Sequence, residues 1–156
     1  MRVLQRFLPR GLYGRAALIL LAPIVTIQLV FSVEFIQRQY EDVTQQMTQG
    51  VVIDLAYLLA EIEASPTPEA ARMRVGPIAE ALAISLAIPA KEGAPLTDRQ
   101  ARIDLSGPTI RATLHEGLPS LVAVDLTDEE RIVRLRFDTR FGPVGVELNR
   151  KRMSAT

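Results

Sequence analysis

The order of apolar and polar residues divides the chain into a helical first half and a last third rich in strands. Residues 16–33 form one apolar run without a charged side chain. Over residues 36–62 apolar side chains recur every three or four positions, which is typical of one face of an α-helix. In the last third the period changes to two, as in Val122, Val124 and Leu126, which is typical of strands with one buried face.

The apolar run is long enough to cross a membrane. As a helix, residues 16–33 span about 27 Å, close to the roughly 30 Å of a bilayer's hydrocarbon core. The apolar part of a cleaved signal is usually about 7–15 residues long and ends in small residues, whereas Phe31, Val33 and Phe35 are bulky. We therefore predict an uncleaved transmembrane helix over 16–33; a cleaved signal and a buried helix of a soluble protein are the alternatives.

Charge predicts the orientation of this helix. Every carboxylate of the chain follows the apolar run, and the arginines before it are Arg2, Arg6, Arg10 and Arg15. Positive charge beside a first transmembrane helix holds that end in the cytoplasm. We predict a cytoplasmic basic segment over residues 1–15, with residues 34–156 on the outside.

A long amphipathic helix is expected to continue directly from the membrane. Its apolar stripe consists of Ile36, Tyr40, Val43, Met47, Val51, Leu55, Leu58 and Ile62. Such a stripe either packs on the domain's own core or forms a seam with a second copy of the helix. Near the membrane no domain is yet available to cover it, so we predict a dimer seam at Ile36, Tyr40, Val43 and Met47. Around residues 51–59 the apolar face widens, which favours burial in the domain.

A second helix is predicted to begin after a turn. Thr67 is placed to cap it and Pro68 suits its first position. The apolar pattern continues toward Ile84 or Leu86, with Gly76-Pro77 as an interruption. Residues 88–109 look like a loop with room for one short strand.

The remaining elements complete an α+β domain. A short helix is expected over residues 106–116. Three strands then follow, joined by turns at 127–130 and 139–143. We predict a three-stranded antiparallel meander with two helices on its apolar face. On its other face, Arg134 and Arg136 should lie beside Glu147 as a cross-strand charge match.

Composition excludes several kinds of chemistry. The chain has 156 residues and no net charge, with a positive start and a mildly acidic remainder that gives no support for nucleic-acid binding. Without cysteine there is no disulfide and no thiolate metal site. The one histidine, His115, stands before Glu116 without the rest of a phospho-accepting motif, so a polar residue at a helix end is the simpler interpretation. We expect no cofactor, no metal site and no catalytic residue.

Two basic groups have a functional and a plain interpretation. Arg134 and Arg136 could bind an anion, or they are solvated residues of a strand. The segment 149–152, Asn-Arg-Lys-Arg, opens a basic tail over residues 150–156 that would lie on anionic headgroups or in water.

The stretch from Leu8 to Glu63, "LPRGLYGRAALILLAPIVTIQLVFSVEFIQRQYEDVTQQMTQGVVIDLAYLLAEIE", resembles the amino-terminal region of EnvZ-type osmosensor histidine kinases, particularly those of alphaproteobacteria. The closing "VGVELNRKRMSAT" is similar to the last sensor strand of that family and the basic residues before its second membrane helix. The resemblance covers the chain in order and carries no catalytic motif.

This resemblance implies a homodimeric protein of the bacterial inner membrane whose sensor domain, residues 34–149 here, faces the periplasm. The expected function is the sensor-input portion of a two-component histidine kinase. The second membrane helix and the kinase core of the family have no counterpart before Thr156. The expected partners are the lipid bilayer, a second copy and the remainder of a kinase. The alternative is a membrane-anchored scaffold or interaction domain that senses nothing.

Overall fold

Helix α1 spans Leu12–Ala64 and belongs to two units of the chain, Met1–Tyr40 and Glu41–Thr156. The computed structural model describes residues 12–101, 104–127 and 131–154. Of the helices in those ranges, one is long and apolar enough to cross a membrane, with a mean hydropathy of 2.4 in its most apolar window. The helical conformation predicted for residues 16–33 and 34–63 is confirmed.

In the first unit, polar side chains of α1 form interactions within the helix itself. Pro23 lies inside the helix and does not end it. The hydroxyl of Thr26 donates a hydrogen bond to the carbonyl of Ala22 at 2.8 Å. Beyond the apolar run, Arg38 and Glu34 form an ion pair one helical turn apart, at 3.0 Å. The apolar side chains of this unit lie exposed along the helix.

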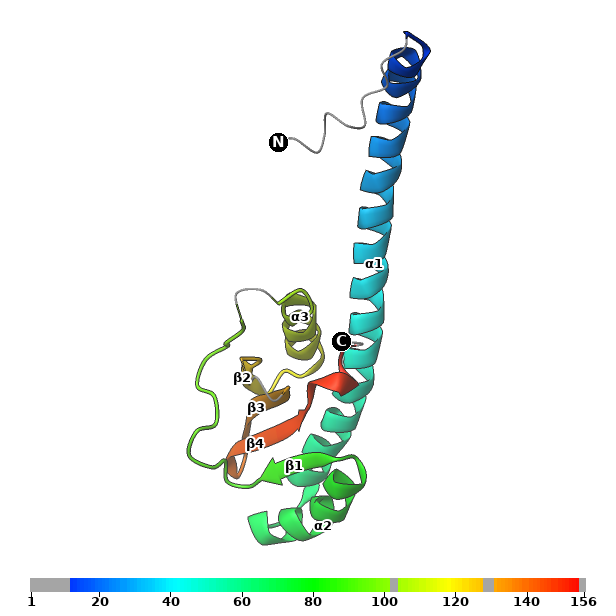
Figure 1. Cartoon of the computed structure of the whole chain (residues 1–156). Coiled ribbons are helices and arrows are strands. Elements are labelled where there is room, and N and C mark those ends of the chain that lie inside the picture. Colours follow the sequence, from blue (N-terminus) through cyan, green and yellow to red (C-terminus); the bar gives the residue numbers. More distant parts are fainter. Residues whose placement is uncertain (1–11, 102–103, 128–130, 155–156) are drawn as a thin grey trace. The chain divides into compact units, whose positions relative to one another are not determined.

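The second unit is an α+β domain built on a four-stranded antiparallel sheet (Figure 1). Its strands lie in the order β1-β4-β3-β2. After α1, the elements in chain order are α2 (Pro68–Ala81), β1 (Ile84–Ala87), α3 (Gly107–Gly117), β2 (Leu121–Asp125), β3 (Ile132–Thr139), β4 (Gly142–Asn149) and the 3₁₀-helix η2 (Arg150–Arg152).

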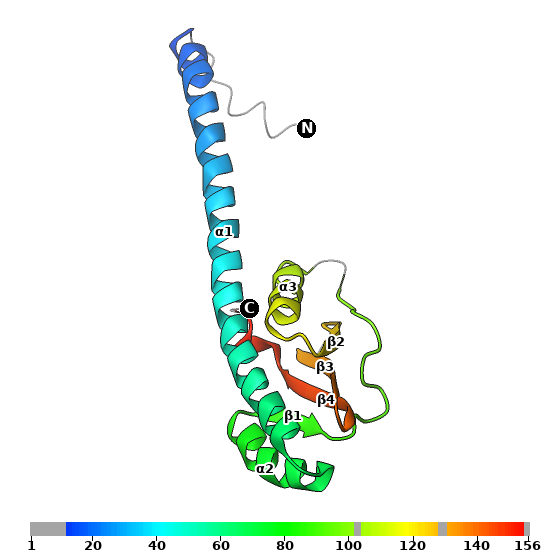
Figure 2. The ribbon, with the colours of Figure 1, turned by 180° about the vertical axis from the view of Figure 1, so that it is seen from behind.

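One face of the sheet and all three helices form a single hydrophobic core. Leu55 of α1, Val75 of α2 and Ile110 of α3 join Leu135 and Val146 of the sheet in this cluster. Helix α2 contacts β1 and α3 contacts β2, at opposite edges of the sheet (Figures 1 and 2). After β1, residues 88–101 run on the side of the sheet away from residues 41–64 (Figure 2).

The structure adds one strand to the predicted meander. Helix α2 ends at Ala81, before the predicted end, and Ile84–Ala87 instead pair with β4 as strand β1. Ala83 adopts a left-handed conformation (φ 51°), which turns the chain out of the helix. The predicted interruption at Gly76-Pro77 was wrong, since α2 continues through both residues. Both are exposed, so water can satisfy the carbonyl that Pro77 leaves without a donor.

Other local predictions are confirmed. Thr67 caps α2 by accepting a hydrogen bond from the Ala70 amide, and Pro68 opens the helix. The β3–β4 hairpin pairs Thr139 with Gly142, whose φ of +93° suits glycine. The short helix predicted over 106–116 is α3. The other predicted turn, 127–130, lies mostly outside the described residues.

Candidate functional site

The predicted dimer seam lies on α1, and its four members differ in exposure. Ile36 is 64% exposed and Val43 is 39% exposed, whereas Tyr40 and Met47 are partly buried. The second half of the same stripe turns into the domain core, as predicted from its wider apolar face. Its buried members are Val51, Leu55, Leu58 and Ile62.

Where the domain begins, α1 carries buried polar side chains. Thr44 and Thr48 are buried one helical turn apart. The hydroxyl of Thr48 lies 2.8 Å from the carbonyl of Thr44 and 3.4 Å from that of Met153. Met153 and Ser154 are themselves buried. The last described residues of the chain therefore pack directly on α1.

Arg152 strengthens this contact. One guanidinium nitrogen lies 2.7 Å from a carboxylate oxygen of Asp54 on α1, and another donates to the carbonyl of Leu82 at the end of α2. A single side chain thus joins three segments that are far apart in the sequence. We call Arg152, Met153 and Ser154, with Thr44, Thr48 and Asp54, the C-terminal clasp.

A second ionic contact lies beside the clasp. The side chain of Asp104 is 5% exposed and pairs with the guanidinium of Arg150. Its Oδ1 also accepts hydrogen bonds from the amides of Ser106 and Gly107, at 3.2 and 2.9 Å, where α3 begins. The Arg150 guanidinium donates to the Ser106 hydroxyl as well. Residues 150–152, predicted as the start of a lipid-facing or solvated tail, thus place two arginines in contacts within the domain.

Several of these residues could not be singled out from the sequence. Thr44 and Thr48 interrupt no apolar pattern, and Asp54 looks like any charge on the polar side of a helix. For Asp104 the sequence holds one weak signal. An acid a few residues before Gly107-Pro108 resembles a helix-start motif.

The outer face of the sheet carries a row of polar side chains across all four strands, and three of them are charged. Register places Asp125 of β2, Arg134 of β3, Glu147 of β4 and Ser85 of β1 side by side. Arg134 Nε lies 3.3 Å from Glu147 Oε1, so the cross-strand match predicted for this pair is confirmed. Arg136 lies on the next row, opposite Gly145.

The fold lowers the pKa of Asp125, which lies at one end of this row. Burial by itself would raise the pKa of Asp125. The hydrogen bonds from the hydroxyl and amide of Thr127 and the charges of Arg99 and Arg134 outweigh burial and hold the pKa below its ordinary value. The ionised carboxylate is therefore the form that the fold stabilises.

His115 lies in the last turn of α3, as the sequence suggested. Its Nε2 is 3.0 Å from a carboxylate oxygen of Asp98, and Asp98 also accepts a hydrogen bond from the amide of Val124. The pair ties α3 to the segment that leaves β1. Within the described ranges no group of three or more histidine, cysteine or acidic side chains is arranged to hold a metal ion.

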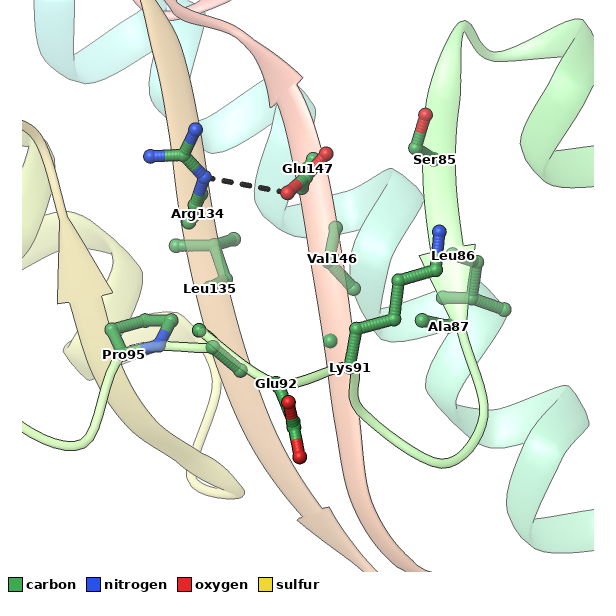
Figure 3. A pocket seen from close by; sticks show the side chains of 13 residues that line it. Ser85, Leu86, Ala87, Lys91, Glu92, Pro95, Arg134, Leu135, Val146 and Glu147 are labelled. Carbon is green, nitrogen blue, oxygen red and sulfur yellow. Dashed lines mark hydrogen bonds and ion pairs between the residues drawn. The ribbon is translucent and has the colours of Figure 1, made fainter. Parts of the chain in front are cut away.

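A pocket of about 330 Å³ opens between this outer sheet face and the segment after β1 (Figure 3). Ser85, Arg134 and Glu147 come from the strands, and Lys91 and Pro95 from that segment. No protein-family model matches this chain, and neither a curated protein nor a solved structure matches it.

Proposed function

We propose that this chain is the sensor-input portion of a membrane-bound two-component histidine kinase, acting as a homodimer in the bacterial inner membrane with its α+β domain in the periplasm. The resemblance of residues 8–63 to EnvZ-type kinases motivates the proposal. The basic amino-terminal segment and the exposed apolar run of α1 are consistent with an anchor whose amino terminus is cytoplasmic. The chain itself is expected to have no kinase activity, because the sequence holds no nucleotide-binding motif.

The observation that carries the proposal is the C-terminal clasp. Met153 packs beside Thr48, and Arg152 pairs with Asp54, so the end of the folded unit lies against the helix that begins it. A rearrangement of the sheet would displace β4 and η2. Because the clasp joins η2 to α1, it would displace α1 as well. A sensor needs such a direct route, because its output is a displacement of one helix relative to another.

Burial on α1 also supports the homodimer. The face opposite the core carries Ile53, which is 64% exposed, and Tyr57, which is 52% exposed. Val43, Gly50 and Tyr57 are spaced seven residues apart, the repeat of a two-stranded coiled coil. We therefore extend the proposed seam from Ile36 and Val43 to Ile53 and Tyr57.

Charge on the flanks of this face permits a parallel pairing. With a seven-residue repeat, Gln49 of one copy would face Asp54 of the other, and Ala56 would face Glu61. No two carboxylates would oppose each other at these positions. A few hundred Å² of apolar surface, at roughly 25 cal/mol per Å², contributes several kcal/mol before the entropy of association is subtracted.

Cysteine crosslinking in native membranes tests both the dimer and its response. The chain has no cysteine, so single substitutions from residue 34 to 60 report on the helix without interference. Disulfide formation should peak at 36, 43, 50, 53 and 57 and should be low at the buried positions 48, 51 and 55. The control is the same scan in detergent at low protein concentration, where the peaks should weaken because a shared bilayer no longer concentrates the copies.

A sensor and a scaffold predict different responses in that experiment. If the domain senses osmolarity, raising the osmolarity of the medium should move the pattern or change its amplitude. A crosslinking pattern that is present but unchanged would favour a scaffold. Exposed Met73 and Leu105, at 81% and 82%, are the surface residues that such a scaffold would offer to a partner. A flat pattern would remove the support for a dimer.

A further inference from the structure

Three paired strands form the floor of the pocket on the outer sheet face. Strands β1, β4 and β3 provide it, with Ser85, Glu147 and Arg134 in one row of the register. The next row of the floor contains Ala87 and Gly145. A Cβ atom on Gly145 would lie 3.5 Å from Ala90, at van der Waals distance, so the segment after β1 lies close to the sheet at this row.

The segment Lys91–Pro95 forms the roof of the pocket (Figure 3). It is anchored on both sides: the Ala90 amide donates to the carbonyl of Pro143 at 2.7 Å, and Asp98 accepts from the Val124 amide. Between these anchors, one described backbone hydrogen bond, from Ala94 to Lys91 at 3.2 Å, supports the roof. Pro95 is buried, so the roof is attached at its far end as well.

Charged groups of both signs line this space. The strands contribute Arg134 and Glu147, which pair with each other. The roof contributes Lys91 and Glu92, and neither forms an ion pair with a described residue. Two positive and two negative side chains make the lining neutral overall. A simple anion or a simple cation would meet repulsion from one pair, whereas a molecule carrying both charges would meet a partner for each.

We infer that this pocket binds a small zwitterion of the α-amino-acid class. Its carboxylate would be held by the Lys91 ammonium, and its ammonium by Glu147 or Glu92. The Ser85 hydroxyl would supply a neutral hydrogen bond, and Ala87 and Pro95 an apolar wall for a short side chain. A volume of about 330 Å³ is at the small end of ligand pockets, which fits a molecule of this size. Binding here does not depend on the proposed sensory role.

Equilibrium dialysis of the full chain in detergent micelles tests the inference. The probes are radiolabelled L-alanine, L-serine and L-glutamine, with propionate and ethylamine as compounds carrying one charge each. At least one of the amino acids should bind saturably, with a Kd of about 1 mM or tighter. Propionate and ethylamine should each bind about tenfold more weakly or not at all, because each loses one charge-assisted contact.

Two substitutions identify the pocket. Lys91→Gln should weaken binding of the amino acid about tenfold, whereas the control Lys151→Gln, which makes the same charge change at an exposed lysine outside the pocket, should leave it unchanged. Ala87→Leu should abolish binding by filling the floor. Lys91 is exposed on the roof, so its substitution is readable even if Ala87→Leu fails to fold.

Three results would overturn the inference. One is the absence of saturable binding for all three amino acids up to about 10 mM, well above the millimolar range of weak ligands. Another is equal weakening by Lys91→Gln and Lys151→Gln. The third is propionate binding as tightly as L-alanine, which would make the site a general anion site.

Discussion

At the scale of single residues, the fold depends on charges that are buried together with their partners. Asp104 is almost fully covered, and its pairing with Arg150 is reinforced by two amides at the start of α3. Its second carboxylate oxygen, Oδ2, is buried without a hydrogen-bond partner among the described residues. A carboxylate in this position is stable because Arg150 is present, since unpaired burial of a charge is costly.

Removing Arg150 should therefore destabilise the folded domain strongly. Arg150→Met is expected to lower the free energy of unfolding by about 3–5 kcal/mol, because the Asp104 carboxylate stays buried without its cation. Arg74→Met is the matched control. Arg74 pairs with Glu61, and the two side chains are 56% and 26% exposed, so the loss of Arg74 should cost less than about 1 kcal/mol. Urea unfolding followed by circular dichroism measures both.

A second substitution separates lost charge balance from lost packing. If the unpaired carboxylate is the cause, adding Asp104→Asn to Arg150→Met should recover part of the loss, because the amide carries no charge. Equal costs for Arg150→Met and Arg74→Met would contradict the role of this pair.

The lowered pKa of Asp125 predicts how the stability of the domain depends on pH. Its pKa is lowered in the folded protein, so its contribution is fully present above the pKa of the unfolded chain, about 3.9, and is lost as the pH falls through the folded value. Asp125→Asn keeps an oxygen that can accept from Thr127 and removes the charge facing Arg99 and Arg134. The variant should be less stable than the parent at pH 7, and the difference should shrink below pH of about 4. A constant difference over this range would show that charge is not the reason.

At the scale of elements, the fit between helices is set by small residues. Gly117 ends α3 where it meets α1. A Cβ atom there would lie 2.5 Å from Cγ1 of Val52, a residue with a stiff β-branched side chain. Gly117 is thus required for the approach of the two helices rather than for its backbone freedom.

Gly117→Ala should destabilise the domain by about 1–3 kcal/mol through overpacking. The control is Gly76→Ala in α2, where a Cβ meets nothing within 4 Å apart from its chain neighbours. The gain in helix propensity, about 0.5–1 kcal/mol, is offset there because Pro77 disfavours a helical residue with a Cβ before it, so little change in stability is expected. The cost of Gly117→Ala should fall sharply in a Val52→Ala background. Persistence of the full cost there would assign the effect to something other than this contact.

Element types were predictable from the sequence wherever the periodic pattern was long. The helical stripe over residues 36–62 and the alternation in β3 and β4 each extend over enough residues to identify a helix or a strand. Strand β1 was missed because its four residues, Ile84–Ala87, continue the apolar spacing of α2 and become a strand only through pairing with β4. Long-range pairing of this kind leaves no local pattern.

The candidate site was less predictable than the fold. Arg134 and Glu147 were paired correctly because strand register follows from the hairpin. Lys91 and Asp104 lie in a connection whose path is set by contacts with distant segments, such as those of Ala90 with Pro143 and of Asp104 with Arg150. Nothing in the order of residues there shows which side chains meet.

At the scale of the whole molecule, the proposed anchor makes a direct prediction about location. A reporter that is active only in the periplasm, fused after Thr156, should be active and should stay with the membrane fraction. The reason is the excess of arginine before the apolar run together with bulky residues where a signal would be cleaved.

Replacing Arg2, Arg6, Arg10 and Arg15 with glutamine should lower the reporter's activity, because the positive charge that holds the amino terminus inside is removed. Replacing the same number of exposed arginines in the domain is the control. A soluble mature protein beginning near residue 34 would show that the apolar run is a cleaved signal.

The C-terminal clasp also determines the order in which the domain can be completed. Arg152 and Met153 contact α1 across 98 and 105 residues of sequence. Contacts of this separation form late, because a long loop has to close before they are gained. At roughly 5–20 residues per second, the ribosome makes Arg152 and Met153 several seconds after that part of α1, which is without these contacts in the meantime. Thr44, Thr48 and Asp54 are polar, so this surface of α1 stays hydrated until the clasp forms. It therefore offers little apolar area for aggregation with another nascent chain.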